Sequence, residues 1–373
     1  MDLTFLEPVY GHPGPVASVH INVSRDAEDA DHAVRLRWGK AREDLAAQGA
    51  DEETLHALDE VVGRTDDASG PLGQIVFAAG GEVLLDLLVS EPPQDHQARF
   101  GPLADPMLYL SRRGRHVPYV LAVVDSIGAD LSAEYASGRR RTERVEGDEE
   151  PTHKPRGGAY HHKQMQRAVD EQVGQNVKRV VDAVRGLAEQ SGAEVIAVAG
   201  EVQVRGEVID QLPDGLRGMA VGLEAGSRAA GSEESPLDAE LRQRLDERAG
   251  EQVRAVANAF EEERGNRERA AEGLAPVVYA LQRAQVRTLL WSPDLVGGDT
   301  ELWTGPSGEQ IALTEKELRD IGVQEPVRAS ADTALVRAAV ATSTDLVFVA
   351  QRDVRLDEGI GAVLRFSDPS LTG

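Results

Sequence analysis

The chain has 373 residues, a formal net charge of -24 and 41% hydrophobic residues, which is enough for folded cores and suggests two or three domains. It contains no cysteine, which excludes disulfides, thiolate metal sites and cysteine nucleophiles. The acidic balance argues against non-specific coating of nucleic acid, although salt screening still allows a local basic contact. No stretch approaches the ~18 consecutive apolar residues of a membrane span and no secretory signal is recognisable, so we expect a soluble, cytoplasmic protein with no membrane contact.

Residues 1–114 are predicted to form a small α/β domain. Its expected elements are, in order, a strand at Pro15–Ser24, helices at Ala27–Ala47 and Glu52–Val62, and a hairpin of Gln74–Ala79 with Glu82–Val89. Asp51 is a suitable N-cap for the second helix, and Gly80-Gly81 permits a tight hairpin turn. The proline-bearing stretch Glu91–Pro106 is predicted to be a connection, and Ser111–Arg115 a basic turn.

Residues 115–228 are predicted to form a second unit, a sheet covered by helices. The nearly continuous apolar run Val117–Asp125 is typical of a buried strand, with Ile127–Tyr135 expected to pair with it. After a loop, the stripe from Met165 to Ala188 predicts one long amphipathic helix, from about His162 to about Gln190. The elements expected next are a strand at Glu194–Ala199, a turn and short helix at Gly200–Gln211, a strand at Leu216–Leu223, and a linker at Glu224–Pro236.

Residues 229–373 are predicted to form a third domain, an α/β/α sandwich opened by a charged helix at about Leu237–Ala270. The acidic face of that helix is interpreted as solvated, with partner docking as the alternative. The remaining expected elements are a helix at Gly273–Ala284, strands at Val286–Trp291 and Thr300–Trp303, a helix at Thr333–Thr342, and strands at Asp345–Ala350 and Gly361–Phe366.

The stretch Pro151–Arg167 is the candidate functional segment. It contains basic side chains and no acid, and its first half cannot form a regular element because of Pro155 and Gly157-Gly158. The candidate contacts here are Lys154, Arg156, Gly157, Gly158, Tyr160, His161, His162, Lys163, Gln164 and Arg167, with Arg139, Arg140 and Arg141 upstream. A basic loop at a helix N-terminus favours an anion, phosphate above all. The wider stretch Arg139–Arg167 has eight Lys or Arg and five Asp or Glu, so a solvated loop of mixed charge is the alternative.

Other chemistries find little support in the sequence. His161 and His162 are adjacent and point about 100° apart on a helix, so they do not both face one metal ion. Asp125 ends a strand, but no further acids accompany it in the pattern that two-metal hydrolysis needs. The phosphate-binding glycine motifs and the serine-hydrolase elbow are absent. We therefore predict no metal and no cofactor. Tyr160 is expected either to stack on an unpaired base or to hold the loop against its own domain.

Four segments resemble the archaeo-eukaryotic release factor and Pelota superfamily. They are VLAVVDSIGADLSAEY (Val120–Tyr135), HKPRGGAYHHKQMQRAVDEQVGQNVKRVVDAV (His153–Val184), VIAVAGEVQVR (Val195–Arg205) and ATSTDLVFVAQRDVRLDEGIGAVLRF (Ala341–Phe366). The likeness is to the bacterial branch, which includes the Balon-like ribosome-hibernation factors, and to its actinobacterial members. It implies a first domain that reaches the decoding region, a ribonuclease-H-like middle domain and an L7Ae-like third domain.

The resemblance also implies a role at the ribosome. Release factors carry Gly-Gly-Gln in the middle-domain loop and use it at the peptidyl-transferase centre in ester hydrolysis. Here Gly157-Gly158 is followed by Ala159, which has no side-chain amide, and Gln164 lies six residues beyond Gly158. Pelota and Balon lack the tripeptide and occupy the A site, so the resemblance implies a binding protein with rRNA or tRNA contacts that works beside elongation factor Tu.

Three functional hypotheses follow. The first is a non-enzymatic ribosome-binding factor that occupies the A site, reaches the peptidyl-transferase centre with residues 151–167 and acts in hibernation or stress. The second is a peptidyl-tRNA or ester hydrolase that uses Gln164, or His161 and His162 as general base. The third is a stress protein that binds another protein. Ribosome association and peptidyl-tRNA turnover distinguish the three.

Overall fold

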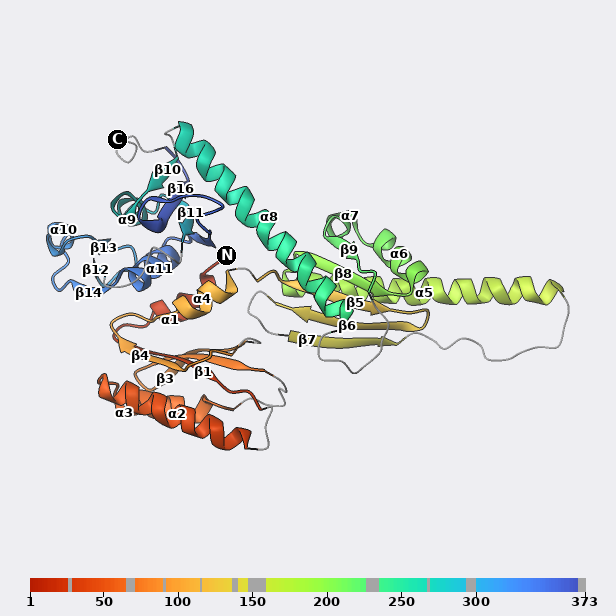
Figure 1. Ribbon diagram of the computed structural model, residues 1–373, viewed down its shortest axis with the longest axis horizontal. Helices are drawn as coiled ribbons and strands as arrows, with labels where there is room; N and C mark the ends of the chain where they lie inside the picture. Colours follow the sequence, from red (N-terminus) through yellow and green to blue (C-terminus); the bar gives the residue numbers. More distant parts are fainter. Residues whose placement is uncertain are drawn as a thin grey trace. The chain divides into compact units, whose positions relative to one another are not determined.

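The computed structural model describes residues 1–25, 29–64, 71–89, 92–114, 116–135, 140–146, 159–225, 235–266, 269–292 and 300–367, without the side chains of 159–170. The chain divides into two compact units. We call Met1–Arg115 with Glu251–Gly373 the outer unit, and His116–Gly250 the inserted unit. Both contain helices and sheets, so the predicted α/β class is confirmed (Figure 1). The division into three domains stays a prediction.

The first part of the outer unit is an antiparallel sheet in the order β3-β2-β1-β4, with two helices on one face (Figure 1). Alternate residues of a strand face the same side of a sheet. On the side covered by the helices, Val19 belongs to the same buried cluster as Leu45 and Leu58. Asp51 accepts a hydrogen bond from the Thr54 N–H at 2.8 Å, which confirms the predicted cap. The elements are β1 (Val16–Asn22), α2 (Ala30–Ala47), α3 (Glu52–Val61), β2 (Gly73–Ala79), β3 (Glu82–Val89) and β4 (Gln97–Gly101).

Two expectations for this region were wrong. The stretch predicted as a connection contains β4, a five-residue edge strand too short to show a clear period. The predicted basic turn is instead the end of α4 (Met107–Arg113), where the Arg113 guanidinium lies 5.3 Å from the centre of the Tyr109 ring. Short elements η1 (Thr4–Leu6) and α1 (Glu7–Tyr10) precede β1.

The last part of the outer unit contains two sheets, ordered β10-β16-β11-β15 and β13-β12-β14. The predicted helices and strands of this region are confirmed within a few residues. The structure adds β10, β13, α10 and β14, each of six residues or fewer and so too short for sequence periodicity to detect. The elements are β10 (Ala270–Glu272), α9 (Leu274–Gln282), β11 (Val286–Trp291), β12 (Glu301–Thr304), β13 (Ile311–Ala312), α10 (Glu315–Asp320), β14 (Val327–Ser330), α11 (Ala331–Ala341), β15 (Asp345–Phe348), η2 (Asp357–Gly359) and β16 (Ile360–Leu364).

The two parts of the outer unit share one hydrophobic core. Leu6 and Leu110 from the first part belong to the same buried cluster as Leu335 and Phe348 from the last part. The backbones of Met1 and Leu346 exchange hydrogen bonds of 2.8 and 3.0 Å, so residue 1 pairs with strand β15. Burial of this apolar surface stabilises the two parts together.

The inserted unit has a five-stranded sheet in the order β7-β6-β5-β8-β9. β5, β8 and β9 are parallel to one another, while β6 pairs antiparallel with both of its neighbours, β5 and β7. Helices α5 and α6 cover one face, and the first half of α8 covers part of the other through Leu241 and Ala249. The elements are β5 (Tyr119–Val124), β6 (Gly128–Glu134), β7 (Arg140–Glu146), α5 (Ala159–Ser191), β8 (Val195–Gly200), α6 (Val202–Gln211), α7 (Asp214–Arg217), β9 (Ala220–Gly222) and α8 (Pro236–Asn266).

The predicted strand pair and long helix of this unit are confirmed, with two local corrections. β7 lies within the stretch predicted as loop; its charged outer positions obscured the strand signal. The strand predicted at Leu216–Leu223 is limited to the three residues of β9, because Pro213 starts the short helix α7 just before it. Over the residues that the structure describes, no helix is both long and apolar enough to cross a membrane.

Candidate nucleic-acid interface

Helix α5 positions the candidate segment, because residues 151–167 end within its first turns. The helix is held to the sheet by a stripe in which Val177, Val180 and Val184 are fully or almost fully buried. The Asn176 Nδ2 donates to the Ser126 carbonyl at 3.1 Å, which ties the helix to the β5–β6 turn. Counting from the N-terminus of α5, Val173 is the first described side chain that contacts this core.

The N-terminal part of α5 extends beyond the sheet (Figure 1). Between Ala159 and Val173 the helix rises roughly 20 Å, at 1.5 Å per residue. Positions 160, 163, 164 and 167 fall on one side of it, turned by roughly 120° from the stripe that faces the sheet. Tyr160, Lys163, Gln164 and Arg167 are thus brought together on one helix side. His161 and His162 lie in the same turns.

Several candidates lie outside the described part of the chain. Lys154, Arg156, Gly157 and Gly158 lie outside the described residues, as does Arg139. The side chains of the candidates on α5 are likewise not described. Their assignment to RNA contact stays a prediction.

The structure does not bring Arg140 and Arg141 to this end of α5. The Arg141 guanidinium donates to the Gln190 Oε1 at 2.8 Å and pairs with Glu143 at 3.2 Å. Gln190 lies 30 residues beyond Tyr160 on the same helix, a separation of roughly 45 Å. Arg141 therefore contacts the C-terminal end of α5, far from the first turns of the same helix.

Arg140 pairs instead with the buried carboxylate of Glu134, while its own side chain stays largely exposed. Its Nε lies 3.0 Å from the Glu134 carboxylate, which is only 5% exposed, and the His116 Nε2 is 3.5 Å from the same carboxylate. Burial, together with the neighbouring Glu134, raises the pKa of Tyr119 to about 12. The sequence did not predict this pairing, and β7, with charged residues at five of its seven positions, offered no clear strand signal.

The end of β5 is organised by hydrogen bonds. The Asp125 carboxylate accepts from the N–H groups of Ile127 and Gly128 at 2.9 and 2.8 Å, so it shapes the β5–β6 turn. Among the described residues, no three His, Asp or Glu side chains are grouped as metal ligands. Asp125 thus has a structural role that needs no ion.

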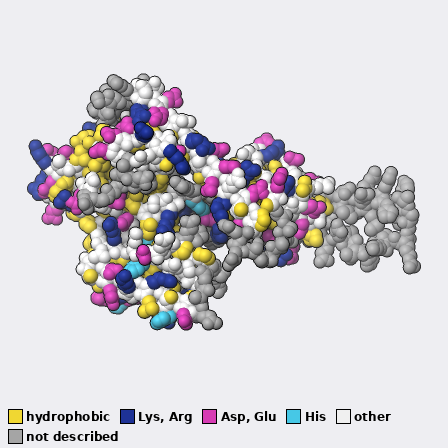
Figure 2. All heavy atoms as spheres, viewed as in Figure 1, with side chains coloured by type: hydrophobic (Ala, Val, Ile, Leu, Met, Phe, Trp, Pro, Cys, Tyr) yellow, Lys and Arg dark blue, Asp and Glu magenta, His cyan; other side chains and the backbone are white. Residues whose placement is uncertain are grey.

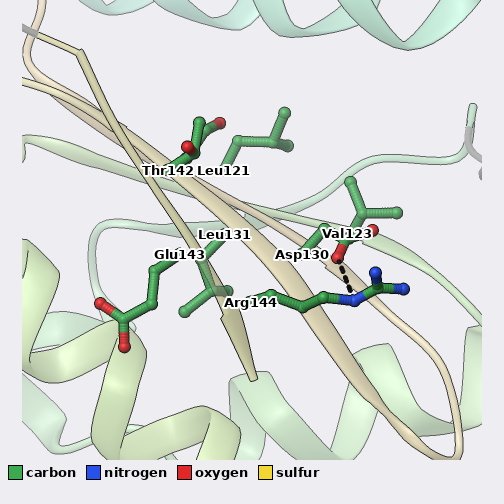
Figure 3. A pocket seen from close by; sticks show the side chains of 8 residues that line it. Leu121, Val123, Asp130, Leu131, Thr142, Glu143 and Arg144 are labelled. Carbon is green, nitrogen blue, oxygen red and sulfur yellow. Dashed lines mark ion pairs between the residues drawn. The ribbon is translucent and has the colours of Figure 1, made fainter. Parts of the chain in front are cut away.

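A shallow pocket of 330 Å³ lies on the sheet face opposite α5 (Figure 3). Its floor follows two rungs of the sheet, Leu121–Ser132–Thr142 and Val123–Asp130–Arg144. The Arg144 Nε pairs with the Asp130 carboxylate at 3.4 Å, and Figure 3 shows the two side chains directed toward each other. The pocket holds no nucleophile activated by a base and lies away from the first turns of α5.

Comparison with known proteins places this chain. The family model described as "Bacterial archaeo-eukaryotic release factor family 2" matches residues 118–266, which include the candidate segment, α5 and α8. The Mycobacterium tuberculosis proteins Rv2629 and MT2704 are each 31% identical to it over 368 residues, covering 96% of this chain and 96% of theirs. The chain belongs to the bacterial archaeo-eukaryotic release factor family. The predicted resemblance to the bacterial branch of the release factor and Pelota superfamily is thereby confirmed.

Solved structures similar to this family member include Dom34 from S. cerevisiae, described as a translation termination-like factor that interacts with Hbs1, and ribosome-bound archaeal Pelota. Dom34 is 11% identical, with a TM-score of 0.43 and coverage of 81% of this chain and 82% of that one. Archaeal Pelota is 15% identical, with a TM-score of 0.41 and coverage of 97% and 93%.

Proposed function

We propose that this family member is a non-enzymatic ribosome-binding factor that occupies the A site and presents residues 151–167 to the peptidyl-transferase centre, in ribosome hibernation. The observation that carries the proposal is the geometry of α5. The C-terminal half of the helix is anchored to the sheet, and its N-terminal part extends roughly 20 Å beyond Val173, its first described core contact. The acid-free basic segment ends in the first turns of this extended part. Membership of a family named for release factors supports the ribosome as the partner.

The chemistry of the segment fits RNA. Lys154, Arg156, Lys163 and Arg167 supply positive charge for phosphates, and the N-terminus of α5 adds partial positive charge. Gly157-Gly158 presents backbone without side chains, which allows close approach to RNA. Tyr160, His161 and His162 supply rings for stacking on unpaired bases. Contact with tRNA and escort by elongation factor Tu stay predictions.

Ribosome cosedimentation at two salt concentrations tests the proposal. We expect the unaltered chain to cosediment with ribosomes, and a Lys154→Ala/Arg156→Ala variant to bind about tenfold more weakly with a smaller salt dependence. The matched control is Lys178→Ala/Arg185→Ala, which removes the same charge from exposed positions on the packed half of α5. Equal weakening in both variants would assign the effect to net charge. No cosedimentation of the unaltered chain at either salt would refute the proposal.

A further inference from the structure

The edge strands of the sheets differ in how they are protected. An edge strand exposes unpaired backbone N–H and C=O groups that can pair with another chain, so proteins commonly cover, shorten or charge their edges. In the described part of the chain, residue 1 pairs with β15, and five of the seven residues of β7 are charged. The edge strands β9, β10, β13 and β14 have four residues or fewer. The two other edges are β4 and β3, on either side of the first sheet.

The β4 edge is closed by the side chain of Gln48, which follows α2. Its Nε2 donates to the Ala98 carbonyl at 3.0 Å, and its Oε1 accepts from the Phe100 N–H at 2.9 Å. The carboxamide thus takes the place that the backbone of a neighbouring strand would take. One edge of this sheet is therefore protected by a side chain.

β3, at the opposite edge, is long and apolar and lacks such protection. Its eight residues, EVLLDLLV, include six apolar ones and neither a proline nor a basic residue. Within the described residues, the backbone of β3 makes no hydrogen bond beyond its ladder with β2. The ladder is irregular only near the β2–β3 turn, between Phe77 and Ala78. Because every second residue of an edge strand directs its N–H and C=O outward, the regular stretch 85–89 offers two or three roughly equivalent pairs.

The charges around β3 are mainly acidic. β2, α3 and α1 pack against β3, and none of these elements contains lysine or arginine. Glu53 and Glu60 lie with His56 on one exposed face of α3, and Glu53 lies against Gly81 in the β2–β3 turn. In Figure 2, hydrophobic side chains reach the surface among charged ones over the part formed by α2 and α3.

These acids are largely uncompensated. Glu53, Glu60 and the exposed Glu82 of β3 have no ion-pair partner among the residues that the structure describes. Asp86 of β3 accepts from the neutral amide of Gln74 at 2.9 Å, so its charge is not balanced by a base. Two arginines lie at the C-terminal end of α3: Arg25 donates to the Gly63 carbonyl and pairs with Asp31, and Arg64 is exposed. Acids thus outnumber the free bases around this edge.

We propose that β3 binds a basic, extended segment of another protein as an added strand. The outward N–H and C=O groups of β3 pair with the backbone of the segment. Its lysine or arginine side chains meet the acids around β3, and its apolar side chains continue the apolar side chains of the strand. A second copy of β3 is the poorer occupant, because each copy carries Glu82 and Asp86 and no base. The inference goes beyond the proposed ribosome association and does not depend on it.

Titration of the full chain with a defined peptide tests the proposal. The probe is the heptapeptide Lys-Val-Lys-Val-Lys-Val-Lys, acetylated and amidated at its ends. We expect it to bind at least about tenfold more tightly than a counterpart with glutamate at every lysine position. We also expect a tenfold loss, or about that, when proline replaces the central valine, because proline lacks an N–H and breaks the ladder. Equal binding of the proline peptide would assign the attraction to charge alone and overturn strand addition.

Variants of the chain locate the contact. Leu88→Lys places a positive charge on the open edge at a side chain that is already 37% exposed, so the lysine peptide should bind about tenfold more weakly. Glu53→Gln/Glu60→Gln should weaken binding several-fold, whereas Asp320→Asn/Glu325→Gln, which removes the same charge from exposed positions of the last part of the outer unit, should not. Normal binding by both β3-side variants would overturn the proposal.

Hydrogen exchange and sedimentation decide which strand is added. We expect the lysine peptide to slow amide exchange within residues 82–89, because the outward N–H groups of β3 become hydrogen-bonded. Binding with protection elsewhere and none in β3 would contradict strand addition. The unaltered chain alone should sediment as a monomer; a dimer that Leu88→Lys dissociates would assign the edge to a second copy and overturn the choice of a basic partner.

Discussion

At the scale of single residues, His20 makes the stability of the outer unit depend on pH. The side chain is 3% exposed, its Nε2 lies 3.2 Å from the Asp105 carbonyl, and burial lowers its pKa from 6.5 to about 4. As pH falls, the His20 side chain therefore binds its proton at a higher pH in the unfolded chain than in the folded chain. The neutral form of His20 contributes fully to the free energy of unfolding above pH 6.5. As pH falls to about 4, this contribution of about 3 kcal/mol is lost.

The variant His20→Gln isolates this effect because it keeps a donor for the Asp105 carbonyl and removes the titration. Denaturant unfolding between pH 7 and 4 should show a pH dependence in the unaltered chain that is about 3 kcal/mol larger than in His20→Gln. Burial raises the pKa of the Asp105 carboxyl, which opposes the histidine effect, so the difference between the two proteins is the informative quantity. Identical pH profiles would show that His20 is not the titrating group.

A substitution at Ala159 distinguishes the binding hypothesis from the hydrolase hypothesis. The proposal places this first residue of α5 beside the peptidyl-transferase centre, where a glutamine after Gly157-Gly158 would recreate the release-factor tripeptide. The unaltered chain should hydrolyse no peptidyl-tRNA on ribosomes, and Ala159→Gln should raise the rate at least about tenfold over background, or ~1.4 kcal/mol. Hydrolysis by the unaltered chain would favour the enzyme hypothesis. An inactive Ala159→Gln that still binds would place the segment elsewhere.

At the scale of elements, the β8–α6 junction depends on one glycine. Gly200 has a φ of 108°, and a Cβ there would collide with the Val124 carbonyl oxygen of the neighbouring strand. We expect Gly200→Ala to lower the free energy of unfolding by about 3 kcal/mol. Gly206, in the interior of α6, is the matched control because a Cβ there meets nothing within 4 Å. Gly206→Ala should raise stability by up to ~1 kcal/mol in the same denaturant titration; equal effects would contradict this reading of the junction.

The sequence predicted long, periodic elements well and short or charged ones poorly. β5 and β11 were predicted from apolar runs because both of their faces meet a core, and α5 was predicted from its apolar stripe because one of its faces meets a core. β7 was missed because five of the seven residues Arg140–Glu146 are charged, which hides the period of a strand, and the Gln190 partner of Arg141 lies 49 residues away in sequence. The contact of Arg141 with Gln190, near the C-terminal end of α5, was likewise not predicted. Ion pairing is a tertiary property that local pattern does not encode.

At the scale of the whole molecule, the inserted unit interrupts the outer unit. The chain leaves the outer unit at Arg115 and returns within the continuous helix α8. The first and last parts of the sequence share a core, which linear reading into consecutive domains does not anticipate.

A site-specific crosslink tests the central claim most directly. A photo-reactive amino acid at position 160, in the first turn of α5, is compared with one at position 178, an exposed position on the packed half of the same helix. The proteins are bound to ribosomes, irradiated, and the crosslinked rRNA nucleotides are mapped. The account predicts crosslinks from position 160 to rRNA of the peptidyl-transferase centre and none there from position 178. Ribosome-bound protein whose position 160 crosslinks to other sites, or to ribosomal proteins alone, would contradict it.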